Sequence, residues 1–427
     1  MKKQYTLAYG KNAVTLELEE EKIIDVLRSR ELPSPENEEA LIREAMANPI
    51  GTSGLTEIIN ANETVCIVIG DITRLWIRHH VIVKVLLEEL NNSGIADEQI
   101  TIISARGSHR NQTTEEIKML VGDDIYRRIP VIEHTGSAED LVDLGHTSRN
   151  TPVRLNRHVV EADRVILTGG IVHHYLAGYG GGKKSVLPGV SSREGIMANH
   201  KHSLNPNGPG LNPDVRAGKL QGNPLSEDMV EAGRMLGVDF IVNILINDQH
   251  KIGLAVAGDL VEAHEKGCAL ADEYYGVPIR EKADLVIASC GGYPKDINMY
   301  QTYKASHNMV HAMKKGGVGI LVSQCCDGIG SDLFYNICTD FADNQAREQH
   351  LSNAYDIAKF AGYTQLVWTQ QNRFIAISDL PDEQIRCMGM TPVNTLEEAL
   401  TLAQEWLGDH YKAYIMPEGA TTFPMLK

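Results

Sequence analysis

The stretch TVCIVIGD, residues 64–71, indicates the fold of this chain. It is a continuous apolar run, rich in β-branched side chains, and it ends on a carboxylate. Such a run is typical of a strand that is buried on both faces of a parallel sheet. Ligands bind outside the carboxyl ends of strands in open α/β sheets, so Asp71, Thr73 and Arg74 are expected at a ligand site.

Similar apolar runs recur along both halves of the chain, with helical patterns between them. This alternation predicts an α/β protein with two domains, each with a mainly parallel sheet flanked by helices. We place the domains at residues 1–275, which include a connecting helix at about 255–275, and 276–427. The further strands are expected at 100–109, 130–135, 163–170, 240–247, 283–292, 316–325, 366–370 and 373–378, and the other helices at 36–46, 79–93, 226–236, 298–315 and 396–407.

The composition restricts the class of protein. The 427 residues are 43% hydrophobic, which is enough for two cores, and the formal net charge of −16 repels nucleic acid and anionic membranes. We find neither a signal peptide nor an apolar segment long enough to span a bilayer, so a cytoplasmic protein is expected. The seven cysteines include no CxxC pair and are expected to be reduced thiols.

The segment Thr168–His200 has the highest density of reactive side chains in the chain. Consecutive glycines let backbone N–H groups approach an anion, so its glycine-rich loop is a candidate phosphate site. The loop lacks the spacing of a P-loop or of a GxGxxG motif, and a flexible turn with two solvated lysines is the alternative. The loop and the lysine pair that follows it are Gly180, Gly181, Gly182, Lys183 and Lys184.

Three histidines that follow predicted strands or lie in loops are candidates for catalysis or metal binding: His109, His174 and His200. Histidine titrates near neutrality, and it serves as a general acid or base or as a metal ligand through one ring nitrogen. Each of the three, taken singly, is more often a structural residue. His200 and His202 lack a cysteine or carboxylate nearby in sequence that would complete a zinc site.

Side chains suited to a carboxylate ligand occur in both halves. Arg74 is able to hold a carboxylate bidentately, although a surface ion pair with Asp71 is the alternative. Tyr300, Gln301 and Lys304 begin a predicted helix of the second half, where Gln301 and Lys304 are i,i+3 neighbours. If both halves contribute, the site lies in an interdomain cleft.

Taken together, six motifs resemble the nickel-dependent lactate racemase family. They occur in the family's order over nearly the whole chain, which makes the resemblance specific. The motifs are DITR (71–74), GSHR (107–110), HHYLAGYGGGKKSVLPG (173–189), ANH (198–200), GGYPKDINMYQ (291–301) and DGIGS (327–331).

The resemblance implies a racemase or epimerase that inverts C2 of a 2-hydroxy acid by proton-coupled hydride transfer. It also implies a nickel-pincer nucleotide, a pyridinium-3-thioamide-5-thiocarboxylic acid mononucleotide that holds nickel, supplied by separate cofactor-synthesis and insertion proteins. By position, Lys184 would be the covalent tether, His200 the nickel ligand, and His109 and His174 the paired acid/base groups. Asp71 and the glycine loop would serve the cofactor, and the substrate side would be formed by Arg74, Trp76, Tyr300, Gln301 and Lys304.

The chain departs from the family pattern at two places. LWIRHH (75–80) follows the DITR motif where the family usually continues with proline, and Gln324, Cys325 and Cys326 precede the DGIGS motif. These departures favour a larger or more polar 2-hydroxy acid at least as much as lactate. Two alternatives are a nucleotide-binding phosphotransferase or hydrolase that uses the glycine loop and its lysines, and a non-catalytic ligand-binding homologue.

Overall fold

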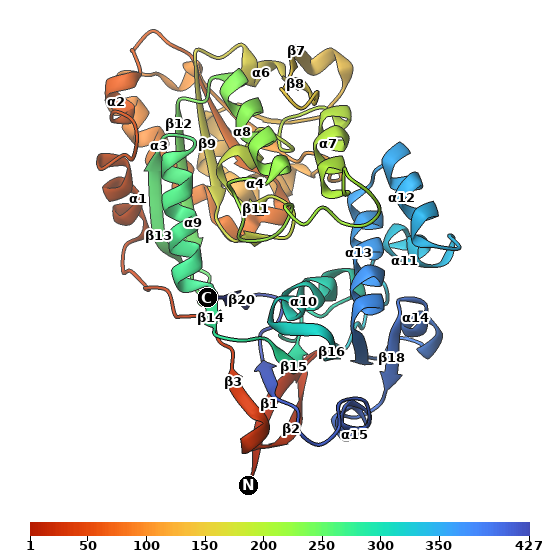
Figure 1. Ribbon diagram of the computed structural model, residues 1–427. Coiled ribbons are helices and arrows are strands. Elements are labelled where there is room, and N and C mark those ends of the chain that lie inside the picture. Colours follow the sequence, from red (N-terminus) through yellow and green to blue (C-terminus); the bar gives the residue numbers. More distant parts are fainter. The chain divides into compact units, whose positions relative to one another are not determined.

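The computed structural model describes residues 1–427, which form two compact units (Figure 1). The N-unit comprises residues 31–203 and 212–272, and the C-unit comprises residues 1–30, 204–211 and 273–427. In this part of the chain the two units meet at residues 272 and 273, and the domain boundary that we predict is at 275. The first 30 residues, which we expected in the N-terminal domain, pack with the C-unit instead.

The N-unit contains a six-stranded sheet with the order β13-β12-β9-β4-β5-β6. Its strands are parallel except for β13, which pairs antiparallel with β12. Every strand predicted in this half is present, but β13 occupies the start of the helix expected at 255–275. The six strands are β4 (Val65–Gly70), β5 (Ile100–Ala105), β6 (Val131–Glu133), β9 (Arg164–Gly170), β12 (Phe240–Ile246) and β13 (Ile252–Gly258).

Helices cover this sheet, and α9 lies in front of it in Figure 1. The remaining N-unit strands are β7 (Leu141–His146), β8 (Pro152–Asn156), β10 (His173–His174) and β11 (Gly178–Tyr179). The helices are α1 (Glu38–Ala47), α2 (Leu55–Ile58), α3 (His79–Asn92), α4 (Thr114–Val121), α5 (Asp123–Arg128), α6 (Arg157–Val160), α7 (Arg193–His200), α8 (Pro224–Leu236) and α9 (Glu262–Tyr274).

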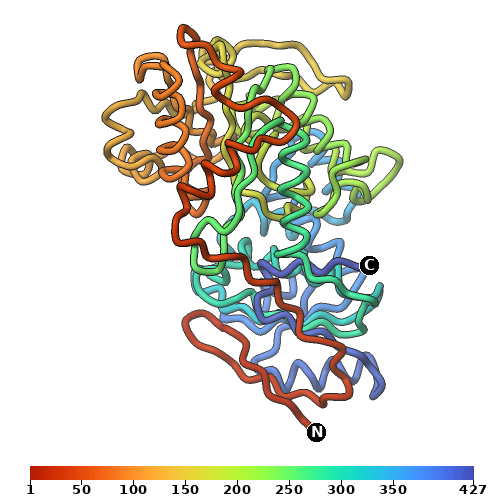
Figure 2. Tube along the Cα trace, turned by 90° about the vertical axis from the view of Figure 1, so that its left-hand side faces the viewer, coloured from red at the N-terminus to blue at the C-terminus, as the bar shows by residue number.

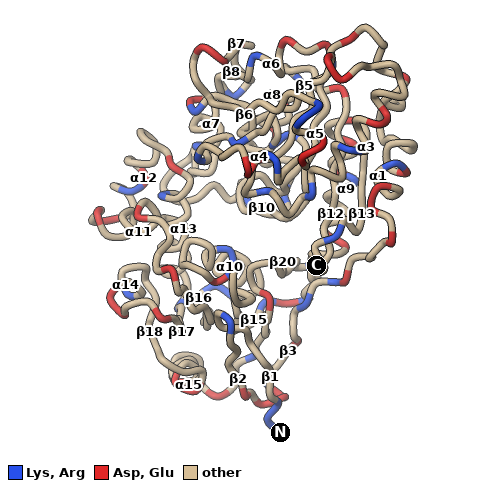
Figure 3. The backbone as a smooth tube through the Cα atoms, turned by 180° about the vertical axis from the view of Figure 1, so that it is seen from behind, with Lys and Arg blue, Asp and Glu red and all other residues tan.

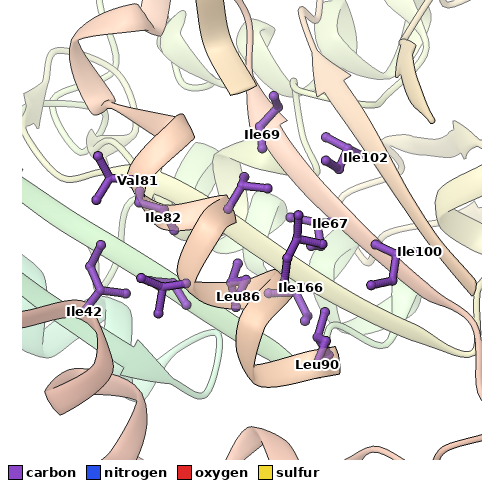
Figure 4. Packing of buried hydrophobic residues seen from close by; sticks show 14 of the residues in the cluster. Ile42, Ile67, Ile69, Val81, Ile82, Leu86, Leu90, Ile100, Ile102 and Ile166 are labelled. Atoms are coloured by element: carbon purple, nitrogen blue, oxygen red, sulfur yellow. The ribbon is translucent and has the colours of Figure 1, made fainter. Parts of the chain in front are cut away.

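The N-unit core joins β4 to α3 (Figure 4). Ile67 and Ile69 of the strand are fully buried, and Ile82 and Leu86 of the helix pack in the same cluster. The α3 face is apolar because these side chains recur at helical spacing, as the sequence predicts. This packing holds the carboxyl end of β4, and therefore Asp71, in a fixed position.

The C-unit contains a parallel sheet with the order β18-β17-β16-β15-β19-β3. Its strands are β1 (Lys2–Tyr9), β2 (Asn12–Glu19), β3 (Ile23–Val26), β14 (Gly276–Ile279), β15 (Ala283–Ser289), β16 (Met313–Val322), β17 (Arg373–Ile377), β18 (Met390–Val393), β19 (Ala413–Met416) and β20 (Phe423–Leu426). Its helices are α10 (Met299–Ala312), α11 (Asp332–Thr339), α12 (Asn344–Asn353), α13 (Ile357–Gln371), α14 (Asp382–Cys387) and α15 (Leu396–Leu407).

Two features of the C-unit differ from the sequence-based prediction. The N-terminal strand β3 pairs with β19 at the edge of the sheet, and the β1–β2 hairpin contributes Leu7 and Leu16 to the same core. Figure 2 shows this segment, in red, beside the blue C-terminal part of the chain. The strand expected at 366–370 is wrong, because these residues belong to the helix α13.

Charged residues of both signs are interspersed in each unit (Figure 3). None of the helices combines the length and the apolar character needed to cross a lipid bilayer.

Candidate active site

The carboxyl ends of β4 and β5 bring Asp71 and His109 together. The Nδ1 atom of His109 lies 2.6 Å from Oδ2 of Asp71, and the Thr73 hydroxyl donates to Oδ1 at 2.6 Å. Burial opposes a charge on Asp71, but the hydrogen bond from His109 keeps the pKa of its carboxyl below the usual value. A carboxylate at Nδ1 fixes the imidazole with its proton on that nitrogen, so Nε2 is left for proton exchange.

The glycine-rich segment places His174 beside Lys184. The Nδ1 atom of His174 accepts the backbone N–H groups of Leu176 and Ala177 at 3.2 and 3.1 Å. The proton of a neutral His174 is therefore on Nε2, which lies 2.8 Å from Nζ of Lys184. An N–H that points at this nitrogen requires the unprotonated amine, which has a lone pair to accept it.

The surroundings of Lys184 favour the same neutral form. Burial, followed by the positive charges of Arg74 and Lys183, lowers the pKa of the Lys184 amine to about 7. An unprotonated lysine is a nucleophile, whereas an ammonium group is not. The Lys184 amine can therefore act as a nucleophile at neutral pH.

His200 is the last residue of α7 and is 2% exposed. Its Nδ1–H donates to the carbonyl of Ile196 at 2.8 Å, so the lone pair of the ring is on Nε2. Burial, with a smaller contribution from Lys184, lowers the pKa of His200 to about 4. A neutral imidazole whose other nitrogen is held by a carbonyl is the form that coordinates a metal ion.

The sequence offered no signal for the residues that hold α7 in place. The carboxylate of Asp228 on α8 is fully buried and accepts hydrogen bonds from Thr147, Thr151 and Asn199 at 2.5, 2.7 and 2.8 Å. Asn199 also donates to the carbonyl of Leu225 at 3.0 Å. Because Asn199 precedes His200, this network positions the candidate metal ligand.

The glycine loop is packed against the protein. Gly180 N–H donates to Val172 at 2.8 Å, and Gly182 N–H donates to the Asn243 side chain at 2.8 Å. A β-carbon on Gly181 would lie 2.6 Å from Asn243 Oδ1. Close packing therefore accounts for these glycines, and the N–H groups of Gly180 and Gly182 are not available to a phosphate.

The two remaining N-unit candidates have different surroundings. Burial lowers the pKa of Arg74, while the Asp71 carboxylate opposes this shift. Trp76 instead packs against the hydrophobic core, and its ring would be 2.6 Å from a β-carbon on Gly170. Packing against the core therefore accounts for the aromatic side chain of Trp76.

The C-unit candidates are neighbours on α10. Lys304 Nζ donates to Oε1 of Gln301 at 2.7 Å, which is the predicted i,i+3 relationship. The Tyr300 ring packs edge-on against Phe334, with the ring centres 5.7 Å apart. Burial raises the pKa of the Tyr300 hydroxyl.

Comparison with known proteins identifies the family. The chain matches the lactate racemase N-terminal domain over residues 9–210 and the lactate racemase C-terminal domain over residues 279–423. It is 32% identical to the lactate racemase of Thermoanaerobacterium thermosaccharolyticum, over 97% of each chain. It is also 32% identical to the lactate racemase of Lactiplantibacillus plantarum, again over 97% of each chain.

Solved structures agree with this result. The structure of the lactate racemase apoprotein from Thermoanaerobacterium thermosaccharolyticum matches with a TM-score of 0.89 and 31% identity, over 99% of this chain and 100% of that one. A Thermotoga maritima protein, at 19% identity and a TM-score of 0.63, covers 92% of this chain and 100% of its own and shares the fold. The chain therefore belongs to the lactate racemase family.

Proposed function

We propose that this protein is a racemase or epimerase that inverts C2 of a 2-hydroxy acid with two histidines and a tethered nickel-pincer nucleotide. The observation that carries the proposal is the buried Lys184 amine, which lies 2.8 Å from Nε2 of His174 and has its pKa lowered to about 7 by burial. Family membership supports the reaction class, because both curated relatives are named lactate racemase. The substrate is lactate or a larger or more polar 2-hydroxy acid.

The residues present fit the proposed cofactor. Lys184 has the protonation state needed to form a thioamide, and His200 has a lone pair on Nε2 that is suited to nickel. Asp228 supports the metal ligand through Asn199. When bound, the cofactor would take up the hydride from C2 of the substrate and return it.

The protein's own groups handle the protons. One histidine, His109 or His174, removes the hydroxyl proton while C2 loses its hydride, so that a planar keto acid forms. Return of the hydride to the opposite face, with a proton from the other histidine, inverts the centre. Asp71 would orient the imidazole of His109 through Nδ1, and Arg74 would hold the substrate carboxylate.

The intact mass of the protein tests the tether. Protein produced together with nickel-pincer synthesis proteins should carry one covalent adduct on Lys184, and a Lys184→Arg variant should carry none and lack racemisation. Lys201 is an exposed lysine near the same segment, so Lys201→Arg is the matched control and should retain the adduct. An unmodified Lys184 under conditions that load a known lactate racemase would refute the proposal.

The substrate is tested separately. A panel of chiral 2-hydroxy acids with methyl, aromatic and dicarboxylate substituents is followed by loss of optical rotation with loaded protein. Racemisation of at least one of them is expected. The phosphotransferase alternative has lost its main support, because the glycine loop donates its N–H groups inside the protein.

A further inference from the structure

Lys183, the neighbour of the proposed tether, lines a pocket of its own. This pocket has a volume of about 540 Å³ and is lined mainly by residues of α8 and α9. Val230, Leu260 and Val261 give it apolar walls. The pocket involves none of the residues assigned above to the cofactor or the substrate.

Lys183 and Lys184 are consecutive residues of a short 3-10 helix (Gly182–Ser185), and their side chains have different surroundings. Lys184 contacts His174, whereas Lys183 is influenced by Cys268 and Glu265 of α9 and lowers the pKa of His264 on the same helix. The Nε2–H of His264 donates to the carbonyl of Gly180 at 2.8 Å. The side chain of Lys183 is therefore not part of the contact between His174 and Lys184.

The Lys183 side chain is buried without a counter-charge. It is 2% exposed, and no carboxylate lies within 4.0 Å of its amino group. Buried lysines are normally paired, because an isolated ammonium group is costly to remove from water. Burial accordingly lowers the pKa of Lys183 to about 8, which favours the neutral amine.

The acidic residues of the pocket do not supply that counter-charge. Glu227 is bound by Arg149 at 2.6 Å, and Glu231 accepts hydrogen bonds from the backbone N–H and the hydroxyl of Ser148. Glu265 is exposed. Besides Lys183, the charged lining comprises these three carboxylates and Arg234, so charges of both signs surround apolar walls and the pocket suits an uncharged molecule that reacts with the amine.

We propose that Lys183 is a second reactive amine, which condenses with a small uncharged aldehyde bound in the pocket between α8 and α9. The nitrogen attacks the carbonyl carbon, and both amine hydrogens leave with the carbonyl oxygen as water. A C=N bond replaces the C=O bond, with no oxidation or reduction. The apolar walls hold the aldehyde chain, and the open pocket releases the water.

Reductive alkylation with propanal tests this reaction. The protein is incubated with propanal and cyanoborohydride at pH 7, and fragmentation of the modified peptides separates Lys183 from Lys184. Lys183 should be alkylated at least about tenfold faster than the exposed Lys201 and Lys251, because a larger fraction of its amine is neutral. In urea, where the pocket is lost, the advantage should disappear.

The second part of the test uses a substitution that fills the pocket with a larger side chain. Val230→Trp should remove the rate advantage of Lys183 and leave Lys201 unchanged, whereas Met235→Trp, on the same helix outside the pocket, should not. Lys183→Arg should eliminate the adduct at this position. Alkylation of native Lys183 no faster than Lys201 would overturn the proposal, and so would an undiminished rate in Val230→Trp. The comparison of native and unfolded parent protein is decisive even if a variant fails to fold.

Discussion

Nε2 of His174 lies 2.8 Å from Nζ of Lys184, so a candidate acid/base group and the candidate tether share one hydrogen bond. Both partners are held from other directions. Backbone N–H groups fix the opposite nitrogen of His174, and burial lowers the pKa of Lys184 to about 7. The two roles are therefore adjacent in space but chemically distinct, and substitution should separate them.

His174→Ala should abolish racemisation without preventing cofactor attachment. General acid/base groups typically contribute about 10²–10⁴-fold to a rate, so kcat should fall by that factor. Intact mass measures loading, and optical rotation measures turnover. His173→Ala is the matched control, because His173 binds Asp272 at 2.9 Å instead of Lys184. Turnover by a loaded His174→Ala protein at the parent rate would contradict the two-histidine scheme.

Asp71→Asn should impair the other histidine. Loss of the buried carboxylate removes the partner that orients the His109 imidazole through Nδ1, so kcat should fall by about 10²-fold or more. Thr73→Val removes only a hydroxyl donor to Asp71 and should have a smaller effect. Turnover by a loaded Asp71→Asn protein at the parent rate would exclude this role.

Buried neutral histidines should make the fold sensitive to acid. Burial lowers the pKa of His79 to about 3, and its Nε2 accepts the Gly70 N–H at 3.0 Å. The unfolded chain takes up a proton near pH 6.5 and the folded protein does not, so the free energy of unfolding falls as pH drops from about 6.5 toward 3. His79 alone should contribute a slope of about 1.4 kcal/mol per pH unit within that window.

Urea unfolding at intervals between pH 5 and 7.5 measures this slope. A His79→Gln variant should show a smaller slope than the parent by about one proton, whatever its absolute stability. His158, on the helix α6, is exposed, so His158→Gln is the control and should leave the slope unchanged. Identical slopes for His79→Gln and the parent would contradict the assignment.

The sequence predicted the strands best where both faces of a strand are buried. A short, continuous apolar run that is flanked by polar residues, such as 64–71, is typical of a buried strand. The same rule failed at 366–370, because α13 is buried on nearly all sides from Phe360 to Trp368 and therefore lacks an amphipathic pattern. β3 was missed because its partner, β19, lies almost 400 residues away.

The site was predictable only in part for a similar reason. Asp71 and His109 follow strands that pair directly, so the parallel sheet brings their ends together. The Asp228 network joins α7, α8 and the β7–β8 region through single hydrogen bonds, for which no local sequence pattern exists. Glycines alone do not distinguish the two roles of the loop, because close packing and anion binding both require glycine.

The contact between Trp76 and Gly170 allows a final test of the packing around the site. A β-carbon at Gly170 would lie 2.6 Å from the Trp76 ring and 3.0 Å from Ile77, so Gly170→Ala should destabilise the fold by about 1–3 kcal/mol. Gly54→Ala is the control, since the nearest atom to its β-carbon is 3.8 Å away.

Trp76→Leu should relieve most of this clash. In a double-mutant cycle followed by urea unfolding, Gly170→Ala should therefore cost less in the Trp76→Leu background than in the parent, with a coupling energy of about 0.5–3 kcal/mol. Strictly additive effects would show that Trp76 does not pack over Gly170. A substrate-facing Trp76 would then become the better explanation of this departure from the family pattern, because a ring released from the core is available to a larger 2-hydroxy acid.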